Sequence, residues 1–214
     1  SDTLLLNILP GEIAQELKEK GEADARKFDA VSILFTDFKE FTQISSGLSP
    51  ESLVRELNVC FKAFDAICEK YSIEKIKTIG DAYMAAGGLP VPSISSAKNT
   101  VLAAFEMIDF ISKRNKECQK SGRPLFEMRT GIHTGPVVAG IVGVKKFQYD
   151  IWGDTVNIAS RMESSGETGK INISKETYDL IRHDEAFTFE HRGKLMVKGK
   201  GCTEMYFVSL RKVI

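Results

Sequence analysis

Residues 147–161 read Phe147-Gln-Tyr-Asp-Ile-Trp-Gly-Asp-Thr-Val-Asn-Ile-Ala-Ser-Arg161. We expect the rest of the chain to be organised around this stretch. The pattern indicates a short strand over residues 149–152, a turn, and a helix with Asp154 as its N-cap. On that helix Asn157 and Arg161 stand four residues apart and therefore share one face. An amide and a guanidinium near a helix start suit an anionic oxygen. An ordinary exposed polar pair would have the same spacing.

The composition is that of a globular domain. The chain has 214 residues, 43% hydrophobic and 27% charged, which is enough for one sizeable core. Its 29 basic residues equal its 29 acidic ones, so we expect no nucleic-acid partner, because such proteins normally carry a basic excess. No apolar run approaches the roughly 18 residues of a membrane span, and no signal peptide is visible. We therefore expect a cytoplasmic domain, with any membrane attachment of the full-length protein in a region outside this chain.

The N-terminal residues predict a short helix and a linker. Pro10 stands where a helix would begin, and apolar residues follow at helical spacing. Residues 21–27 are polar and typical of a linker. The helix is either an arm that packs on the domain or the end of a transducing helix from an upstream sensor. We divide the chain into residues 1–27, helix and linker, and residues 28–214, the main domain.

The main domain alternates β-type and helical patterns. This order predicts an α+β fold with helices packed on a mixed or antiparallel sheet. We interpret His133 as structural rather than as a base or ligand. The expected elements are a strand over 31–37, a helix opened by Ser49 and Pro50, a hairpin over 73–86 with its turn at Gly80-Asp81, a helix with Val101 to Ile111 on its inner face, strands over 125–132 and 137–142 joined by a turn at His133–Pro136, a strand over 170–173, a helix opened by Ser174, and strands over 187–190 and 204–208.

Two aspartates are candidates for a metal site. Asp37 ends a predicted core strand, and Asp81 lies at the tip of the predicted hairpin. Two neighbouring carboxylates repel each other unless a cation lies between them, and Mg²⁺ with phosphate oxygens is a common solution. Backbone N–H groups just after Asp37, including those of Phe41 and Thr42, could receive a phosphate. The alternative is two loop aspartates that never meet.

Five blocks, in order, resemble the catalytic domain of class III nucleotidyl cyclases, the adenylyl and guanylyl cyclases. The resemblance covers nearly the whole chain. It implies a ferredoxin-like α+β fold that works as a head-to-tail homodimer, with sites at the interface. The blocks are Leu34-Phe-Thr-Asp-Phe-Lys-Glu-Phe-Thr42, Lys75-Ile-Lys-Thr-Ile-Gly-Asp-Ala-Tyr-Met84, Arg129-Thr-Gly-Ile-His-Thr-Gly135, the stretch over 147–161, and Val197-Lys-Gly-Lys-Gly201.

The resemblance implies a two-metal reaction. Asp37 and Asp81 match the family's metal-binding aspartates, and the carbonyl of Phe38 stands where the family adds a backbone ligand. Two divalent cations, Mg²⁺ or Mn²⁺, are therefore expected. One would activate the ribose 3′-hydroxyl for attack on the α-phosphate and the other would hold the triphosphate, which releases pyrophosphate and forms a 3′,5′-cyclic monophosphate.

The remaining site residues also follow from the resemblance. Asn157 matches the residue that orients the ribose, and Arg161 matches the one that stabilises charge on the α-phosphate. Lys198 and Arg129 match positions that neutralise the outgoing phosphates. The family takes its aspartates from one subunit and its Asn and Arg from the other, so a monomer should be inactive.

The base is predicted to be adenine. Lys77 and Asp150 occupy the family's base-recognition positions, where guanylyl cyclases carry Glu and Cys. A carboxylate accepts from the exocyclic amine of adenine and an ammonium donates to its N1, whereas guanine reverses both roles. The sequence thus favours ATP as substrate and an adenylyl cyclase. One departure is Glu40, because family members often have glycine shortly after the first metal aspartate.

Three other functions stay open on the sequence alone. A guanylyl cyclase is the nearest, and Lys77 and Asp150 count against it. A silent regulatory or dimerisation domain would be expected to lack a metal aspartate or a transition-state residue, and none is missing. A polymerase-like nucleotidyl transferase is a fold-level analogy that the neutral charge counts against.

Overall fold

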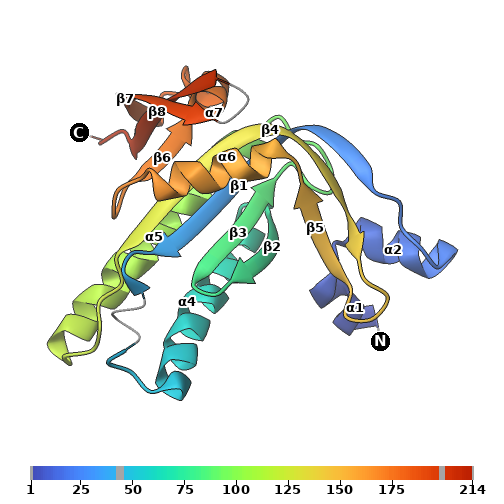
Figure 1. Cartoon of the computed structure of the whole chain (residues 1–214), viewed down its shortest axis with the longest axis horizontal. Coiled ribbons are helices and arrows are strands. Elements are labelled where there is room, and N and C mark those ends of the chain that lie inside the picture. Colours follow the sequence, from blue (N-terminus) through green and yellow to red (C-terminus); the bar gives the residue numbers. More distant parts are fainter. Residues whose placement is uncertain (1, 42–45, 198–200, 214) are drawn as a thin grey trace.

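The computed structural model describes residues 2–41, 46–197 and 201–213, in which one sheet carries helices on both faces (Figure 1). The helices are α1 (Asp2–Ile8), α2 (Gly11–Lys20), α4 (Pro50–Lys70), α5 (Ser96–Lys120), α6 (Asp154–Ser164) and α7 (Lys175–Ile181). The strands are β1 (Arg26–Phe38), β2 (Glu74–Ile79), β3 (Ala82–Gly87), β4 (Met128–Val142), β5 (Gln148–Trp152), β6 (Ile171–Ser174), β7 (Phe187–Val197) and β8 (Gly201–Leu210).

The sheet has a ferredoxin-like centre. The elements β1, α4, β2, β3, α5 and β4 follow one another along the chain, and the strand order across the sheet is β2-β3-β1-β4-β6-β8-β7, with β5 paired to β4. The β4–β6 pair is parallel and the other pairs are antiparallel. A βαββαβ unit with central order β2-β3-β1-β4 is the ferredoxin-like arrangement. The predicted α+β fold is confirmed.

The two faces of β1 build two cores, because successive side chains of a strand point to opposite faces. Leu34 belongs to a cluster with residues of α4 and α5. Ile33 and Phe35 belong to a second cluster, with residues of α2, β5 and α6. The continuous apolar run in β1 therefore reflects a strand covered on both sides.

The N-terminal helix is a packed arm in this structure. Leu9, Ile13 and Ala14 are buried in the second core, and α1 precedes α2. The predicted linker is too long, because Arg26 already belongs to β1 and pairs with Glu16 of α2 at 2.9 Å. Among the described residues, no helix combines the length and apolar character needed to cross a bilayer.

Strand β4 is continuous where a turn was predicted. Its pairing with β1 runs from Val31 opposite Gly135 to Phe28 opposite Val137, so two residues of β1 face Pro136 alone. This β-bulge interrupts the ladder where proline has no N–H to donate, and bulges are where sheets accept proline. The turn predicted over His133–Pro136 was therefore wrong.

Serine side chains cap two of the described helices, α4 and α7. Ser49 accepts from the N–H of Ser52 at 3.2 Å, and Ser174 caps α7, as predicted. The cap predicted at Asp154 was wrong. Gly153, with φ of 140°, is the N-cap of α6, and Asp154 is the first helical residue. Only glycine readily adopts that backbone conformation.

Candidate functional site

The two aspartates predicted to bind metal meet through one backbone donor. The N–H of Phe38 donates to Asp37 Oδ1 at 2.8 Å and to Asp81 Oδ2 at 3.2 Å. The β2–β3 turn thus brings Asp81 to the end of β1. Burial raises the pKa of Asp81 to about 7, and the neighbouring Asp37 carboxylate acts in the same direction. The alternative of two aspartates that never meet is excluded.

This carboxylate pair fits a hard divalent cation. A cation between the two groups would relieve the Asp37–Asp81 repulsion, which adds to the effect of burial on the pKa of Asp81. Across residues 2–41, 46–197 and 201–213, no group of three or more His, Cys, Asp or Glu is spaced to hold a metal ion. Further ligands would therefore be oxygens of phosphate, water or backbone, as the predicted carbonyl of Phe38 would be.

Arg129 stands beside the pair and forms an ion pair with a residue that no sequence motif indicated. It is the Cα partner of Asp37 across the β1–β4 ladder. Its Nε lies 3.0 Å from Oε2 of Glu163 on α6, whose side chain is 8% exposed. Burial raises the pKa of Glu163, whereas Arg129 and Asp37 act to lower it. The sequence feature that could have indicated Glu163 is an acidic residue next to Met162 on the buried face of α6.

The predicted base-recognition pair forms an ion pair. Lys77 Nζ on β2 lies 2.8 Å from Asp150 Oδ2 on β5. The other carboxylate oxygen, Oδ1, accepts from the N–H of Ile151 at 2.8 Å. Asp150 is 8% exposed, so its carboxylate is held in one place. The structure thus brings together two residues that are 73 positions apart.

Asn157 and Arg161 are exposed on one face of α6, as their spacing predicted. Arg161 donates from Nη1 to the carbonyl of Met196 on β7. In the part of the chain that the structure covers, no hydrogen bond or ion pair joins Asn157 or Arg161 to Asp37 or Asp81. One chain therefore presents two separate halves of the predicted site.

The segment after Asp37 is described only in part. Thr42 and Lys198 lie outside the described residues. The ring of Phe41 packs toward the core, 6.4 Å from the ring of Phe38, so a phosphate contact would fall to its backbone. Glu40 is exposed and takes a left-handed φ of 56°, at the position where the family often has glycine.

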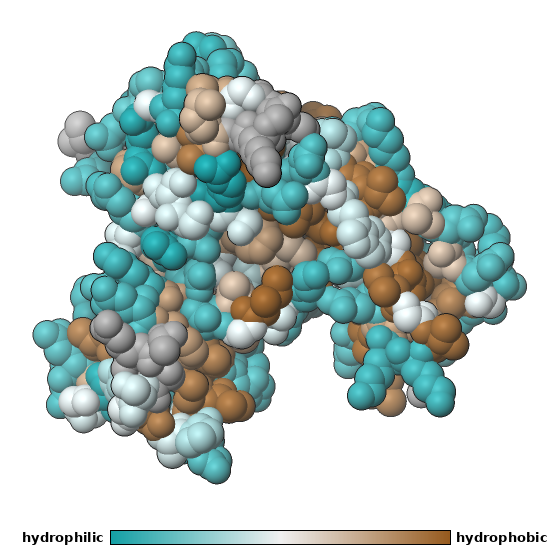
Figure 2. Space-filling view, in the orientation of Figure 1, coloured by the Kyte–Doolittle hydropathy of each residue, from teal (hydrophilic) through white to brown (hydrophobic). Residues whose placement is uncertain are grey.

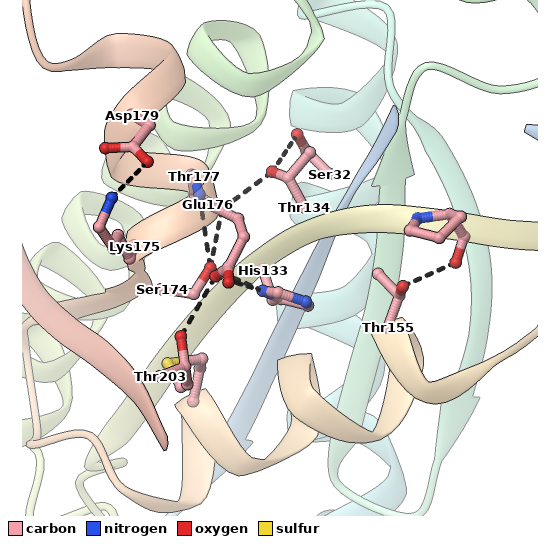
Figure 3. Close-up of polar contacts among 12 residues, drawn as sticks. Ser32, His133, Thr134, Thr155, Ser174, Lys175, Glu176, Thr177, Asp179 and Thr203 are labelled. Atoms are coloured by element: carbon pink, nitrogen blue, oxygen red, sulfur yellow. Dashed lines mark hydrogen bonds and ion pairs between the residues drawn. The ribbon is translucent and has the colours of Figure 1, made fainter. Parts of the chain in front are cut away.

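His133 lies in a buried polar network, in keeping with its structural interpretation (Figure 3). Its Nδ1 is 2.6 Å from Ser174 Oγ and 3.6 Å from Glu176 Oε2. The Thr203 hydroxyl donates to the same Glu176 oxygen at 3.2 Å. The network joins β4, β6, α7 and β8 beside a cavity of about 250 Å³.

Comparisons with known proteins identify the family of this chain. A family model described as the adenylate and guanylate cyclase catalytic domain matches residues 23–210. An adenylate cyclase of Mycobacterium tuberculosis is 40% identical over 214 residues, which cover 100% of this chain and 47% of that protein. The guanylate cyclase soluble subunit beta-2 of Rattus norvegicus is 40% identical over 208 residues, 97% of this chain and 30% of that protein. The chain thus spans less than half the length of these relatives.

Solved structures share the fold. An adenylyl cyclase from P. aeruginosa superposes with a TM-score of 0.81 at 30% identity, covering 89% of this chain and 98% of the other. The catalytic core of a rhodopsin-guanylyl cyclase with converted specificity, in complex with ATPαS, has a TM-score of 0.81 at 35% identity and covers 88% of this chain and 100% of the other. Both nucleotide specificities occur among these similar proteins.

Proposed function

This chain belongs to the adenylate and guanylate cyclase catalytic domain family, and we propose that it converts ATP into 3′,5′-cyclic AMP and pyrophosphate. The observation that carries the choice of ATP is the Lys77–Asp150 ion pair. Relatives that make either cyclic nucleotide are about equally similar, so overall identity does not select the base.

The ion pair presents the hydrogen-bonding pattern of an adenine site. Asp150 is an acceptor whose Oδ1 is already held by the N–H of Ile151, which leaves Oδ2 to share between Lys77 and a ligand. The exocyclic amine of adenine would donate to this carboxylate, and Lys77 would donate to N1. Guanine would set its O6 against the carboxylate, so roughly 1–3 kcal/mol of discrimination per contact is reasonable.

Asp37 and Asp81 would hold two divalent cations, Mg²⁺ or Mn²⁺. Metal ions bound there would favour the ionised 3′-hydroxyl and screen the phosphate charge. Asn157 would orient the ribose, and Arg161 would donate to the α-phosphate oxygens as charge grows on them. Arg129 and Lys198 would balance the charge of the pyrophosphate.

A homodimer would complete the site. The aspartates and the Asn157–Arg161 face are separate within one chain, so a second copy would supply the missing half. The β4–β5 arm carries exposed apolar side chains at Val138 and Trp152, which are Cα partners. Figure 2 shows a hollow between the part of the molecule that contains α4 and the part that contains β5, with apolar surface on its walls. Exposed apolar surface of this kind is typical of an interface.

The N-terminal segment, predicted as residues 1–27 but ending before β1 at Arg26, would connect the cyclase domain to an upstream regulatory region. Helix α2 packs directly on the second core, so a displacement of this arm would reach the sheet that carries the ion pair. The greater length of the relatives leaves room for such a region. A membrane attachment, if the full-length protein has one, would belong there too.

The test is product formation from ATP and from GTP, in parallel, with Mg²⁺ and with Mn²⁺. Wild type should make cyclic AMP, Asp81→Ala should make none, and Lys77→Glu combined with Asp150→Cys should shift toward cyclic GMP. Asp109→Ala, which removes an exposed carboxylate on α5, is the control and should keep activity. Cyclic GMP as the main wild-type product would refute adenine selection, and no product at any protein concentration would indicate a silent domain.

A further inference from the structure

Arg129 has a carboxylate on each of two neighbouring elements, Asp37 at the paired position of β1 and Glu163 on α6. Arg129 is the Cα partner of Asp37, and Asp37 shares the N–H of Phe38 with Asp81. Glu163 approaches the Arg129 guanidinium from α6, with its Oε2 3.0 Å from Arg129 Nε. The Arg129 guanidinium therefore has two possible partners, one on the neighbouring strand and one on the helix above it.

The fold places Glu163 there through an unusually close helix–strand contact. A Cβ on Gly131 would lie 2.0 Å from the backbone nitrogen of Glu163, so only glycine lets α6 rest this close to β4. Gly131 is two residues from Arg129, on the same strand. The Glu163 and Arg129 side chains are 8% and 26% exposed, so water screens their attraction weakly.

We propose that Glu163 is a positioning residue of the metal centre, which holds Arg129 off Asp37 and so leaves Asp37 available to a divalent cation. The inference rests on the proposed role of Asp37 and Asp81 as metal ligands. Oppositely charged side chains on paired strand positions attract each other, and arginine pairs readily with carboxylates. Without Glu163, the guanidinium would turn to Asp37 and compete with the metal.

The experiment is direct titration of the metal-free chain with Mn²⁺. The electron paramagnetic resonance signal of the free ion reports how much Mn²⁺ remains unbound. No nucleotide and no turnover are needed. Asp81→Asn identifies the binding that belongs to this site. Glu163→Gln should weaken that binding about tenfold, as loss of a residue supporting a metal ligand typically does. Glu167→Gln, which removes an exposed carboxylate four residues later, should leave it unchanged.

The decisive comparison is the effect of Glu163→Gln on Mn²⁺ affinity in a chain that lacks Arg129. In an Arg129→Ala background, Glu163→Gln should cost no Mn²⁺ affinity, because no guanidinium remains to compete. An equal loss in both backgrounds, or no loss in either, would overturn the proposal. If Glu163→Gln alone fails to fold, the double variant and Arg129→Ala still test it, because both should bind Mn²⁺ at least as tightly as wild type. Wild-type binding that survives Asp81→Asn would refute the metal site itself.

Discussion

Burial raises the pKa of individual side chains outside the proposed site as well as within it. Glu74 on β2 is half-buried, and burial raises its pKa to about 7, with the Glu12 charge on α2 adding to the effect. It faces the N-terminal arm that covers the second core. Tyr149, whose hydroxyl is buried without a hydrogen-bond partner in the described structure, lies near the same charges.

Glu74 should make stability fall as the pH rises. Because its folded-state pKa lies above the ordinary value of 4.5, the folded chain binds the proton more tightly than the unfolded chain. The resulting stabilisation is complete below pH 4.5 and is lost as the pH rises through about 7. A tenfold change in proton affinity corresponds to about 1.4 kcal/mol, so an effect of a few kcal/mol is the upper bound, which partial exposure to solvent would reduce.

The measurement is the free energy of unfolding by urea between pH 5 and pH 8. Glu74→Gln, which keeps the shape of the protonated group, should flatten the decline. Glu69→Gln, on the exposed face of α4, should leave the wild-type profile intact. A Glu74→Gln profile parallel to wild type would contradict the assignment.

At the scale of elements, the contact between α6 and β4 positions residues of both halves of the proposed site. One side of α6 carries Glu163 toward Arg129, and the exposed side carries Asn157 and Arg161. The distance between helix and strand is set by Gly131, where a side chain would collide with helix backbone rather than with a flexible group. Backbone cannot yield by changing rotamer, so the helix itself would have to move.

Gly131→Ala should displace α6 from β4. We expect a loss of about 2–4 kcal/mol in the free energy of unfolding, together with loss of cyclase activity. Thermal unfolding should show a melting temperature lower by roughly 5–15 °C. Gly11→Ala is the control, because its Cβ would meet only Leu6, at 3.9 Å, and should be tolerated. A Gly131→Ala protein with wild-type stability would show that the close approach is not required.

At the scale of the whole molecule, the two halves of the proposed site do not meet within one chain. The aspartates lie where β1 ends and β2 turns into β3, whereas Arg161 reaches toward β7 at the far end of the strand order. A symmetric pair of chains can match each half with its complement and form two equivalent sites. A variant that is defective in one half should then be rescued by a variant defective in the other.

Mixing Asp81→Ala with Arg161→Ala should restore about one quarter of wild-type activity. Random exchange makes about half of the dimers mixed, and each mixed dimer has one intact site out of two. Cyclic AMP production after co-refolding or co-expression is the measurement. Mixing Asp81→Ala with Asp37→Ala, which damage the same half, should restore nothing. Absence of recovery in the first mixture would mean that each chain completes its own site.

Sequence patterns predicted the order of elements well where the signals are local. The caps at Ser49 and Ser174, the Gly80-Asp81 turn and the core strand over residues 31–37 depend on neighbouring residues, and they were confirmed. Errors arose where a neighbouring strand changes what a residue can do. A turn was predicted over His133–Pro136, yet the bulge in β1 lets β4 continue through Pro136, because no ladder donor is needed there.

The family, the α+β fold and the residue types of the site followed from the chain alone, because they depend on motif order and local periodicity. Which carboxylates share a donor, and which one holds Arg129, depended on the tertiary structure. Glu163 carries no motif signal, and its importance arises only because Gly131 allows a helix backbone to lie against a strand some thirty positions earlier. Contacts between distant residues are set by packing, which no local spacing records.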